Sequence, residues 1–264
     1  MKLNPSVLEI NLSEVENIIK RFIKGYIKNN GFEGIIIGLS GGVDSSTIAA
    51  LSCSAIGNEN VTGLILPEKE TYNIKDINDA KIVAEKFKIK VETHNISESL
   101  ESFCKNIPIF DYKDKVSKGN IKARIRMIYL YYYANKFNKL VCGSSNKSET
   151  MIGYFTKWGD GGADIAPIMD LYKTQVRRLA IHLGIPKRIA VKPASPNLWL
   201  NQSAEKELGM KYEILDLVLY GIEHLMTIED IARDLNINKS LVLKIKKRVL
   251  FSEHKRRMPL TTKI

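Results

Sequence analysis

A buried strand that ends abruptly in a loop almost without side chains is the feature that most constrains this fold. The segment GIIIGLSGGVDSST, residues 34–47, passes from a continuous apolar run into Ser-Gly-Gly, then into an acid and two hydroxyl side chains. An unbroken, isoleucine-rich run is typical of a parallel strand that is covered on both faces. The segment 43–54 that follows has the composition of a helix. We therefore expect a strand, loop and helix at the start of an α/β fold.

Strand and helix patterns alternate along the first two thirds of the chain, which indicates a parallel sheet with helical crossovers. From about residue 198 onward the pattern is helical only. We expect one domain over 1–264, with an α/β core at about 30–195 and a C-terminal helical extension at about 198–264. The predicted helices are 13–29, 43–54, 74–87 and 122–137, and the predicted strands are 34–39, 61–67, 90–96 and 140–145.

The glycine loop has the chemistry of an anion site. A strand that turns through Ser40, Gly41 and Gly42 into a helix presents backbone N–H groups and the positive end of the helix dipole. Asp44 would repel a phosphate unless a cation lay between them, so we expect Asp44 to bind Mg²⁺. The loop fits neither GxxxxGK[ST] nor GxGxxG. A plain turn without a ligand is the alternative.

Composition limits the kinds of partner. The chain has 40 Lys and Arg against 29 Asp and Glu, a formal charge of +11. This excess favours a nucleic acid or a phosphate-rich small molecule, or reflects solvated helix faces. Cys53, Cys104 and Cys142 lie far apart without a CxxC pair, so they are expected to be reduced core residues of a cytoplasmic protein. The sequence predicts no membrane span.

The loop SGGVDS, residues 40–45, resembles the pyrophosphate-binding loop of the adenylating ATP pyrophosphatases. That superfamily includes NAD synthetase, GMP synthetase, asparagine and argininosuccinate synthetases and tRNA thiolation enzymes. Three further stretches resemble the NAD synthetase family, and they keep its order along the chain. They are KGNIKARIRM (118–127), GSSNKSETMIGYFTKWGDGGADIAPIMDLYKTQV (143–176) and HKRRMPL (254–260).

This resemblance implies a fold and a reaction. The fold would be α/β, a doubly wound, mostly parallel, five-stranded sheet with helices on both faces, Rossmann-like and of the HUP type. The reaction would be the ATP-dependent amidation of deamido-NAD with ammonia, giving NAD, AMP and pyrophosphate through an adenylated intermediate. The chain has no room for a glutaminase-like domain beside this fold, so we expect free ammonia or ammonia from another protein. The family is homodimeric, which implies a homodimer.

The resemblance also assigns residues around ATP and its metal. Mg²⁺ would be held by Asp44 and Glu149, and Lys173 in DLYKTQV would contact phosphate. Ser144 stands where the family has a threonine, and Ser195 matches another hydroxyl position. The full set implied for ATP binding is Gly38, Leu39, Ser40, Gly41, Gly42, Val43, Asp44, Ser45, Ser144, Lys173 and Ser195.

A second set of residues matches the positions that bind deamido-NAD. They are Arg124, Lys157, Asp164, His254 and Lys255. The catalytic residues implied by the resemblance are Asp44, Lys173 and Asp164. The glycine-rich segment 153–167 carries two members of the dinucleotide set and could close as a lid that excludes water.

Two other kinds of protein remain as alternatives. A tRNA thiolation enzyme would share the glycine loop and suit the basic charge, but it normally needs a catalytic or metal-binding cysteine. A DNA-binding regulator is suggested by TIEDIARDLNINKSLVLKIKKR, residues 227–248, which has the apolar spacing of a helix-turn-helix and a basic second helix. Two helices that merely pack on the domain explain the same pattern, so nucleic acid binding is the less favoured interpretation.

Overall fold

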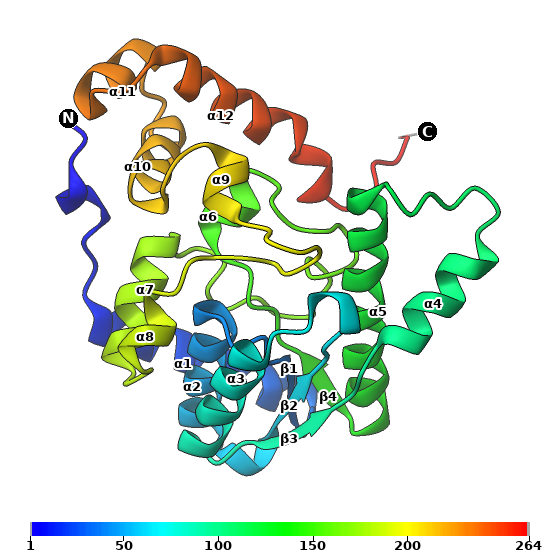
Figure 1. The fold of residues 1–264 in the computed structure, drawn as a ribbon. Coiled ribbons are helices and arrows are strands. Elements are labelled where there is room, and N and C mark those ends of the chain that lie inside the picture. The colour runs from blue at the N-terminus through cyan, green and yellow to red at the C-terminus, as the bar shows by residue number, and fades with distance from the viewer. Residues whose placement is uncertain (1, 263–264) are drawn as a thin grey trace.

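The parallel sheet predicted from the alternating pattern lies at the centre of the computed structural model, which describes residues 2–262 (Figure 1). All neighbouring strands run parallel, in the order β3-β2-β1-β4. The strands are β1 (Gly34–Gly38), β2 (Val61–Ile65), β3 (Lys90–Thr93) and β4 (Lys139–Val141). The α/β class with helices on both faces is therefore confirmed, whereas the prediction of five strands is wrong for the part of the chain that the structure describes.

One further backbone contact beside β4 lies outside the four strands. Asp164 donates its backbone N–H to the Val141 carbonyl at 3.0 Å, and the Gly143 N–H reaches the Ile165 carbonyl at 2.8 Å. Only one isolated bridge results, between Cys142 and Ile165. The segment cannot extend into a strand because glycines precede it and Pro167, which has no N–H group, follows it.

Alternate residues of β1 explain why its apolar run is unbroken. Ile35 and Ile37 belong to a core cluster with α1, α2, α3 and α7, whereas Ile36 belongs to a second cluster with α4 and α5. Successive side chains of a strand point to opposite faces, so a sheet covered on both sides needs this pattern. The helices are α1 (Leu12–Asn30), α2 (Val43–Ile56), α3 (Ile74–Lys86), α4 (Ser97–Asn106), α5 (Lys115–Lys136) and α7 (Lys173–His182).

Helix α5 is longer than its periodicity predicted and begins at Lys115 rather than at 122. The Asp114 side chain caps it by accepting the Ser117 N–H at 3.0 Å. Gly119 inside the helix hid this first turn, since glycine disfavours helices. A Cβ at Gly119 would lie 3.0 Å from Leu198 Cβ, so close packing explains the small residue.

The C-terminal helices form a third core cluster around α10 (Figure 1). The helix-turn-helix pattern came from Ile228, Ile231, Ala232 and Leu235. Ile231 and Ala232 are buried in this cluster, and Ile228 and Leu235 pack against it partly buried. Their apolar faces therefore serve packing within the chain. The helices here are α9 (Ala204–Leu208), α10 (Tyr212–Glu223), α11 (Ile228–Leu235) and α12 (Lys239–Phe251), and the short elements elsewhere are α6 (Lys147–Met151), α8 (Lys187–Ala190), η1 (Pro5–Leu8), η2 (Asn58–Asn60), η3 (Lys69–Thr71) and η4 (Glu253–Lys255).

Residues 2–262 include no helix that is both long enough and apolar enough to cross a membrane.

Candidate active site at the carboxyl edge of the sheet

The strand order reverses between β1 and β4, so the carboxyl ends of these two strands form the switch point of the sheet. Strands β2 and β3 extend the sheet on one side of β1, while β4 pairs on the other side. In open α/β sheets, ligands bind at such a reversal, beyond the carboxyl ends of the strands. The glycine loop follows β1 directly, and the segment 142–149 follows β4. The sequence-predicted ATP loop therefore lies at the position where this fold class binds ligands.

The glycine loop is bent tightly against the first turn of α3. Gly41 has a φ of +74°, and a Cβ there would lie 2.1 Å from the Asp76 carbonyl oxygen. Gly42 is the N-cap of α2 and makes no side-chain cap hydrogen bond. The first N–H groups of α2 are therefore left without the side-chain acceptor that helix starts usually have. Such an end can accept an anionic ligand.

Three predicted site residues, Lys173, Asp44 and Glu149, lie together beside the glycine loop. The Lys173 Nζ lies 2.5 Å from Asp44 Oδ2 and 3.0 Å from Glu149 Oε1. The lysine side chain is only 3% exposed. Asn146 lies in the same group, since its side-chain amide donates to Asp44 Oδ1 at 3.0 Å and its Oδ1 accepts the Glu149 N–H at 3.0 Å. Side chains that follow β1, follow β4 and begin α7 therefore converge on one point.

The charges of this group depend on one another. Burial disfavours the Lys173 ammonium, but the carboxylates of Asp44 and Glu149 outweigh burial and raise the pKa of Lys173. Burial, together with the Asp44 carboxylate, raises the pKa of Glu149, and Lys173 only partly offsets this. The ammonium is thus held in its charged form, while the Asp44 carboxylate opposes the ionisation of Glu149.

Two fully buried polar residues of α10 support this group, and the sequence reasoning missed both. The Tyr212 hydroxyl donates to Glu149 Oε1 at 3.1 Å. Asp216 Oδ1 accepts the Ser148 hydroxyl at 2.5 Å. An acid inside the apolar run YEILDLVLY was the available signal, because a buried carboxylate needs partners.

Four of the five predicted deamido-NAD residues meet at a second place, between α5 and the C-terminal segment. The Lys157 ammonium donates to the His254 carbonyl at 2.7 Å, and Arg124 donates to the Lys157 carbonyl at 3.2 Å. Lys255 donates to the carbonyls of Gly153 and Phe155 at 2.8 and 2.7 Å. Positions 97 to 102 residues apart in the chain are therefore in contact, and the HKRR segment is attached to the glycine-rich segment 153–167.

Asp164, the fifth member, lies at the end of β4. Its Oδ2 accepts the Val141 N–H at 2.8 Å, and its Oδ1 accepts the Tyr131 hydroxyl at 3.1 Å. The residue is exposed. Ser144 lies just beyond the same strand, half-buried. Both predicted residues are thus at the carboxyl edge of the sheet.

Ser195 is exposed and lies on the segment that connects α8 to α9. Its hydroxyl donates to Asn197 Oδ1 at 2.9 Å, and Asn197 in turn donates to Asp76 Oδ2 at 2.7 Å. Asp76 also supplies the carbonyl that faces Gly41. The Ser195 segment and the glycine loop are therefore held against the same turn of α3.

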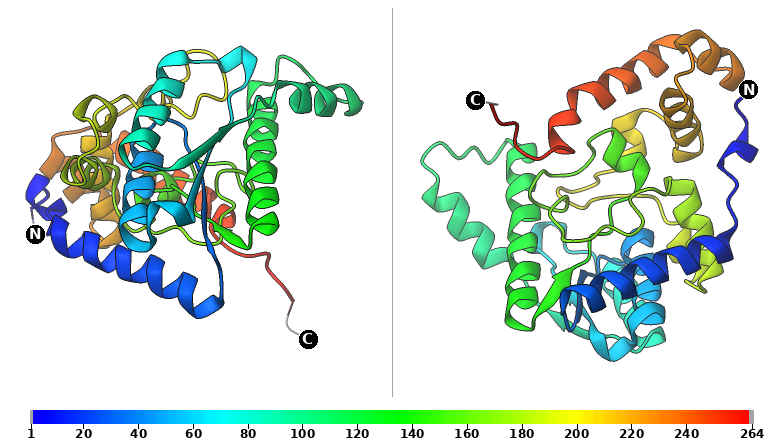
Figure 2. Two further views of the ribbon diagram at one scale, coloured as in Figure 1. Left: turned by 90° about the horizontal axis from the view of Figure 1, so that it is seen from below. Right: turned by 180° about the vertical axis from the view of Figure 1, so that it is seen from behind.

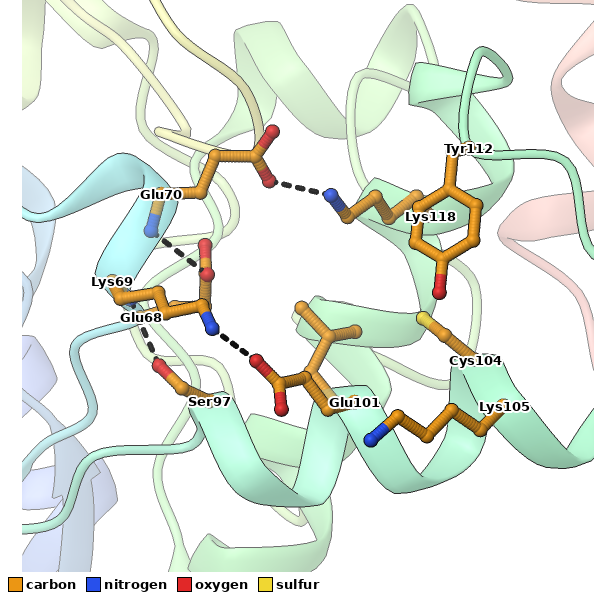
Figure 3. Close-up of a pocket in the computed structure, with 10 residues that line it drawn as sticks. Glu68, Lys69, Glu70, Ser97, Glu101, Cys104, Lys105, Tyr112 and Lys118 are labelled. Carbon is orange, nitrogen blue, oxygen red and sulfur yellow. Dashed lines mark hydrogen bonds and ion pairs between the residues drawn. The ribbon is translucent and has the colours of Figure 1, made fainter.

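A pocket of about 470 Å³ lies elsewhere, between the segment after β2, helix α4 and the start of α5 (Figure 3). Two of its three lysines are already paired with acids, since Lys118 Nζ lies 2.7 Å from Glu70 and Lys69 pairs with Glu101. None of the predicted site residues lines it. The lining residues are Glu68, Lys69, Glu70, Ser97, Leu100, Glu101, Cys104, Lys105, Tyr112 and Lys118.

The three cysteines have the environment of core residues. Cys104 and Cys142 are buried and Cys53 is half-buried, all as free thiols. Burial raises the pKa of all three thiols, that of Cys53 to about 11. A raised pKa makes a thiol a poor nucleophile, which weighs against a cysteine-dependent thiolation enzyme.

Comparison with known proteins decides the family. A family model described as NAD synthase matches residues 15–259. This chain belongs to the NAD synthase family. The family predicted from the three sequence stretches is thereby confirmed. Two curated relatives, both described as NH(3)-dependent NAD(+) synthetases, are each 44% identical to it. The Pyrococcus horikoshii relative aligns with 95% of this chain and 96% of its own length, and the Methanocaldococcus jannaschii relative with 96% and 98%.

Solved structures of the family share the fold over nearly the whole chain. An NMN synthetase from Francisella tularensis superposes with a TM-score of 0.85 at 33% identity. An NH3-dependent NAD synthetase from Campylobacter jejuni superposes with a TM-score of 0.81 at 28% identity. In both comparisons the match covers 97% of this chain and 100% of the other. The helices after residue 198 therefore belong to the NAD synthase fold.

Proposed function

We propose that this protein amidates deamido-NAD with ammonia, using ATP and releasing AMP and pyrophosphate. The convergence of Asp44, Glu149 and Lys173 beside the glycine loop carries the proposal, because it supplies an anion site, two carboxylates and a buried ammonium at one edge of the sheet. The relatives at 44% identity, described as NH(3)-dependent NAD(+) synthetases, support the same reaction.

In this proposal the N–H groups at the start of α2 bind the β- and γ-phosphates of ATP. Lys173 exchanges part of its pairing with Asp44 and Glu149 for the phosphates as negative charge builds on the departing pyrophosphate. A compact ammonium suits this task, and its place between two carboxylates keeps it charged. The carboxylate of the nicotinate ring then attacks the α-phosphorus, the bond to pyrophosphate breaks, and an adenylate forms.

The residues present fit a magnesium ion. Asp44 and Glu149 are the protein carboxylates at this point, and residues 2–262 contain no group of three or more His, Cys, Asp or Glu able to enclose a metal. Mg²⁺ characteristically takes one or two protein carboxylates and completes its shell with phosphate oxygens and water. When bound, the ion would neutralise phosphate charge and relieve the repulsion between Asp44 and Glu149.

The cationic group of Arg124, Lys157 and Lys255 suits the pyrophosphate and carboxylate of deamido-NAD. Asp164 remains exposed at the end of β4, where its carboxylate can orient ammonia and take up a proton. Ammonia attacks the acyl carbon of the adenylate, the bond to AMP breaks, and the nitrogen loses one proton to give the amide. The segment 153–167, which carries Lys157 and Asp164, would close over this region and exclude water from the adenylate.

We also propose a homodimer in which α5 faces the second copy. Arg124, Ile128 and Tyr132 recur every fourth residue on one face of α5, and Ile128 and Tyr132 are 50% and 67% exposed. Figure 2 shows α4 projecting from the body of the molecule beside this helix. This face therefore carries two exposed hydrophobic side chains beside a predicted dinucleotide-binding residue. Such a face fits a site that is completed by a second copy of the chain.

Light scattering tests this arrangement. The wild-type chain should have twice the mass of one chain, and Tyr132→Glu should reduce it to the mass of one chain because a charge in the interface is costly. Tyr26→Glu is the matched control, since Tyr26 is 40% exposed on α1, on the other face of the sheet. A wild-type monomer at micromolar concentration would contradict the dimer.

The reaction is tested by incubating the protein with ATP, Mg²⁺, ammonium and deamido-NAD and separating the nucleotides. We expect NAD and AMP in equal amounts and no ADP. Nicotinic acid mononucleotide should be tried in parallel, because one structural relative is described as an NMN synthetase. The higher identity to the NAD(+) synthetases favours the dinucleotide. Formation of ADP, or a preference for the mononucleotide, would contradict the proposal.

A further inference from the structure

We propose that Tyr212 and Asp216 of α10 are positioning residues for the Mg·ATP site, so that the C-terminal helices set the geometry of a site built on the sheet. Both side chains are fully buried, and both reach the group of Asp44, Glu149 and Lys173 directly or through one residue. This inference rests on the proposed role of that group in binding Mg·ATP.

The spacing of the two residues is what brings them to the same place. Tyr212 and Asp216 are four residues apart, so they project from one face of α10. Leu215, Leu217, Val218 and Leu219 occupy most of the remaining buried surface of this helix. A carboxylate in such surroundings is costly unless hydrogen bonds satisfy it, and here they do.

Asp216 joins the two elements that carry the reactive side chains. Its Oδ1 accepts the Ser148 hydroxyl at 2.5 Å, and its Oδ2 accepts the Thr174 N–H at 2.8 Å. Ser148 immediately precedes Glu149, and its Oγ also accepts the Lys173 N–H at 2.8 Å. One buried carboxylate therefore fixes α6, which carries Glu149, relative to the first turn of α7, which carries Lys173.

Tyr212 contacts the charged side chains of Glu149 and Lys173 directly. Its hydroxyl and the Lys173 ammonium both donate to Glu149 Oε1, at 3.1 and 3.0 Å. Both of these hydrogen bonds therefore fall on the same oxygen of Glu149. The Lys173 Nζ also lies 5.4 Å from the centre of the Tyr212 ring, within reach of a cation–π contact. Tyr212 thus orients Glu149 so that one oxygen remains available to a cation.

Binding of ATP, measured by calorimetry without deamido-NAD or ammonium, separates this role from general stabilisation. Each protein is titrated with ATP once in Mg²⁺ and once in EDTA. The ratio of the ATP affinity in Mg²⁺ to the ATP affinity in EDTA measures how much the metal contributes to ATP binding. Partners of metal ligands typically change metal affinity by about 10–100-fold, so we expect Tyr212→Phe and Asp216→Asn each to lower the ratio about tenfold. Tyr212→Phe removes only the hydroxyl. Asp216→Asn leaves one side-chain oxygen as an acceptor, whereas both oxygens of the aspartate accept a hydrogen bond.

Glu213→Gln is the matched control. Glu213 lies on the same helix between the two residues, but its side chain is 58% exposed and pairs with Arg177 at the surface. It should keep the wild-type ratio. Thermal unfolding accompanies each titration, and if Asp216→Asn does not fold, Tyr212→Phe decides the question. A folded Tyr212→Phe protein with the wild-type ratio would overturn the inference, whatever its melting temperature.

The outcomes also separate this inference from the proposed function. If wild-type protein binds ATP equally in Mg²⁺ and EDTA and forms no AMP, the proposed function fails. If the wild type forms AMP and shows the metal effect, while both variants match it, only the positioning role fails.

Discussion

Asn146 donates its side-chain amide to Asp44 Oδ1 at 3.0 Å, and this contact joins the loop after β1 to the loop after β4. The two residues are 102 positions apart in the chain. Their meeting follows from the strand order, which places β4 beside β1. The contact holds the Asp44 carboxylate beside Lys173 and makes Asp44 the first residue to test.

Asp44→Asn should lower AMP formation about 100-fold or more, because it removes one of two carboxylates available to the metal. The melting temperature should change little, since Lys173 keeps its pairing with Glu149. Asp170→Asn is the control, because the Asp170 side chain is 95% exposed and pairs with Lys147. Near wild-type turnover in the Asp44 variant would remove the basis for the metal assignment.

Gly41→Ala should destabilise the fold and weaken ATP binding. A non-glycine residue in this left-handed conformation costs about 1–3 kcal/mol, and the new Cβ would meet the Asp76 carbonyl oxygen. Gly25→Ala in the middle of α1 makes the opposite prediction, since nothing lies within 4 Å of its Cβ position. That variant should stabilise the protein by about 0.5–1 kcal/mol. Chemical denaturation measures the change in the free energy of unfolding for both variants. Changes of the same sign in the two variants would contradict the description of the loop.

Lys157→Ala should weaken the binding of deamido-NAD while leaving ATP almost unaffected. Hydrogen bonds to charged groups contribute about 1.5–3 kcal/mol, so the KM for deamido-NAD should rise about tenfold or more. The position of Lys157 beside His254, away from Lys173, is the reason for the selectivity. Lys81→Ala, an exposed lysine on α3, is the control. Equal losses for both substrates would show that Lys157 has no preference for the dinucleotide.

Cys53 should react slowly with iodoacetamide at neutral pH. Burial, with a contribution from Glu59, raises the pKa of this thiol to about 11, and the thiolate is the reactive form. The alkylation rate should therefore rise as the pH approaches 11, whereas the unfolded chain should react near the ordinary thiol pKa of about 8.5. Mass spectrometry of the Cys53 peptide gives the rates. A native rate that levels off near pH 8.5 would contradict the buried environment.

The basic helix α12 allows a direct test against DNA binding. Arg248 donates to the Ile152 carbonyl at 3.2 Å, so Arg248→Ala should lower the melting temperature. Replacing Lys244, Lys246 and Lys247 together by alanine should leave turnover and melting temperature unchanged. If this triple variant instead loses a salt-dependent affinity for duplex DNA that the wild type has, the regulator interpretation gains support.

Sequence periodicity predicted a helix or strand correctly wherever one strong local pattern defined the element. The helix predicted over 13–29 is α1, because Ile19, Ile23 and Ile27 recur every fourth residue and Gly31 ends the helix with a φ of +72°. The fifth strand was expected from the family resemblance alone, and no segment of the sequence was assigned to it. Among residues 2–262 only the isolated bridge between Cys142 and Ile165 adds to the four strands.

The residues of the candidate site also fall into those that the sequence predicted and those that it did not. The glycine loop and Asp44 were predictable because their chemistry is contained in consecutive residues, a strand, a turn and a helix start. Tyr212, Asp216 and Asn146 were not predicted, because what they do depends on partners 63 to 102 positions away. No local pattern specifies which distant side chain a buried carboxylate will meet.

By itself the sequence determined the α/β class, the glycine loop between the first strand and its helix, and the NAD synthase family, because each is encoded in periodicity or in contiguous motifs. Only the tertiary structure decided that the sheet has four strands among residues 2–262, that the HKRR segment lies on the glycine-rich segment, and that α10 reaches the charged group. These facts depend on packing between distant elements. Packing selects one arrangement from the complementary shapes and charges of the whole chain, which a local reading of the sequence does not contain.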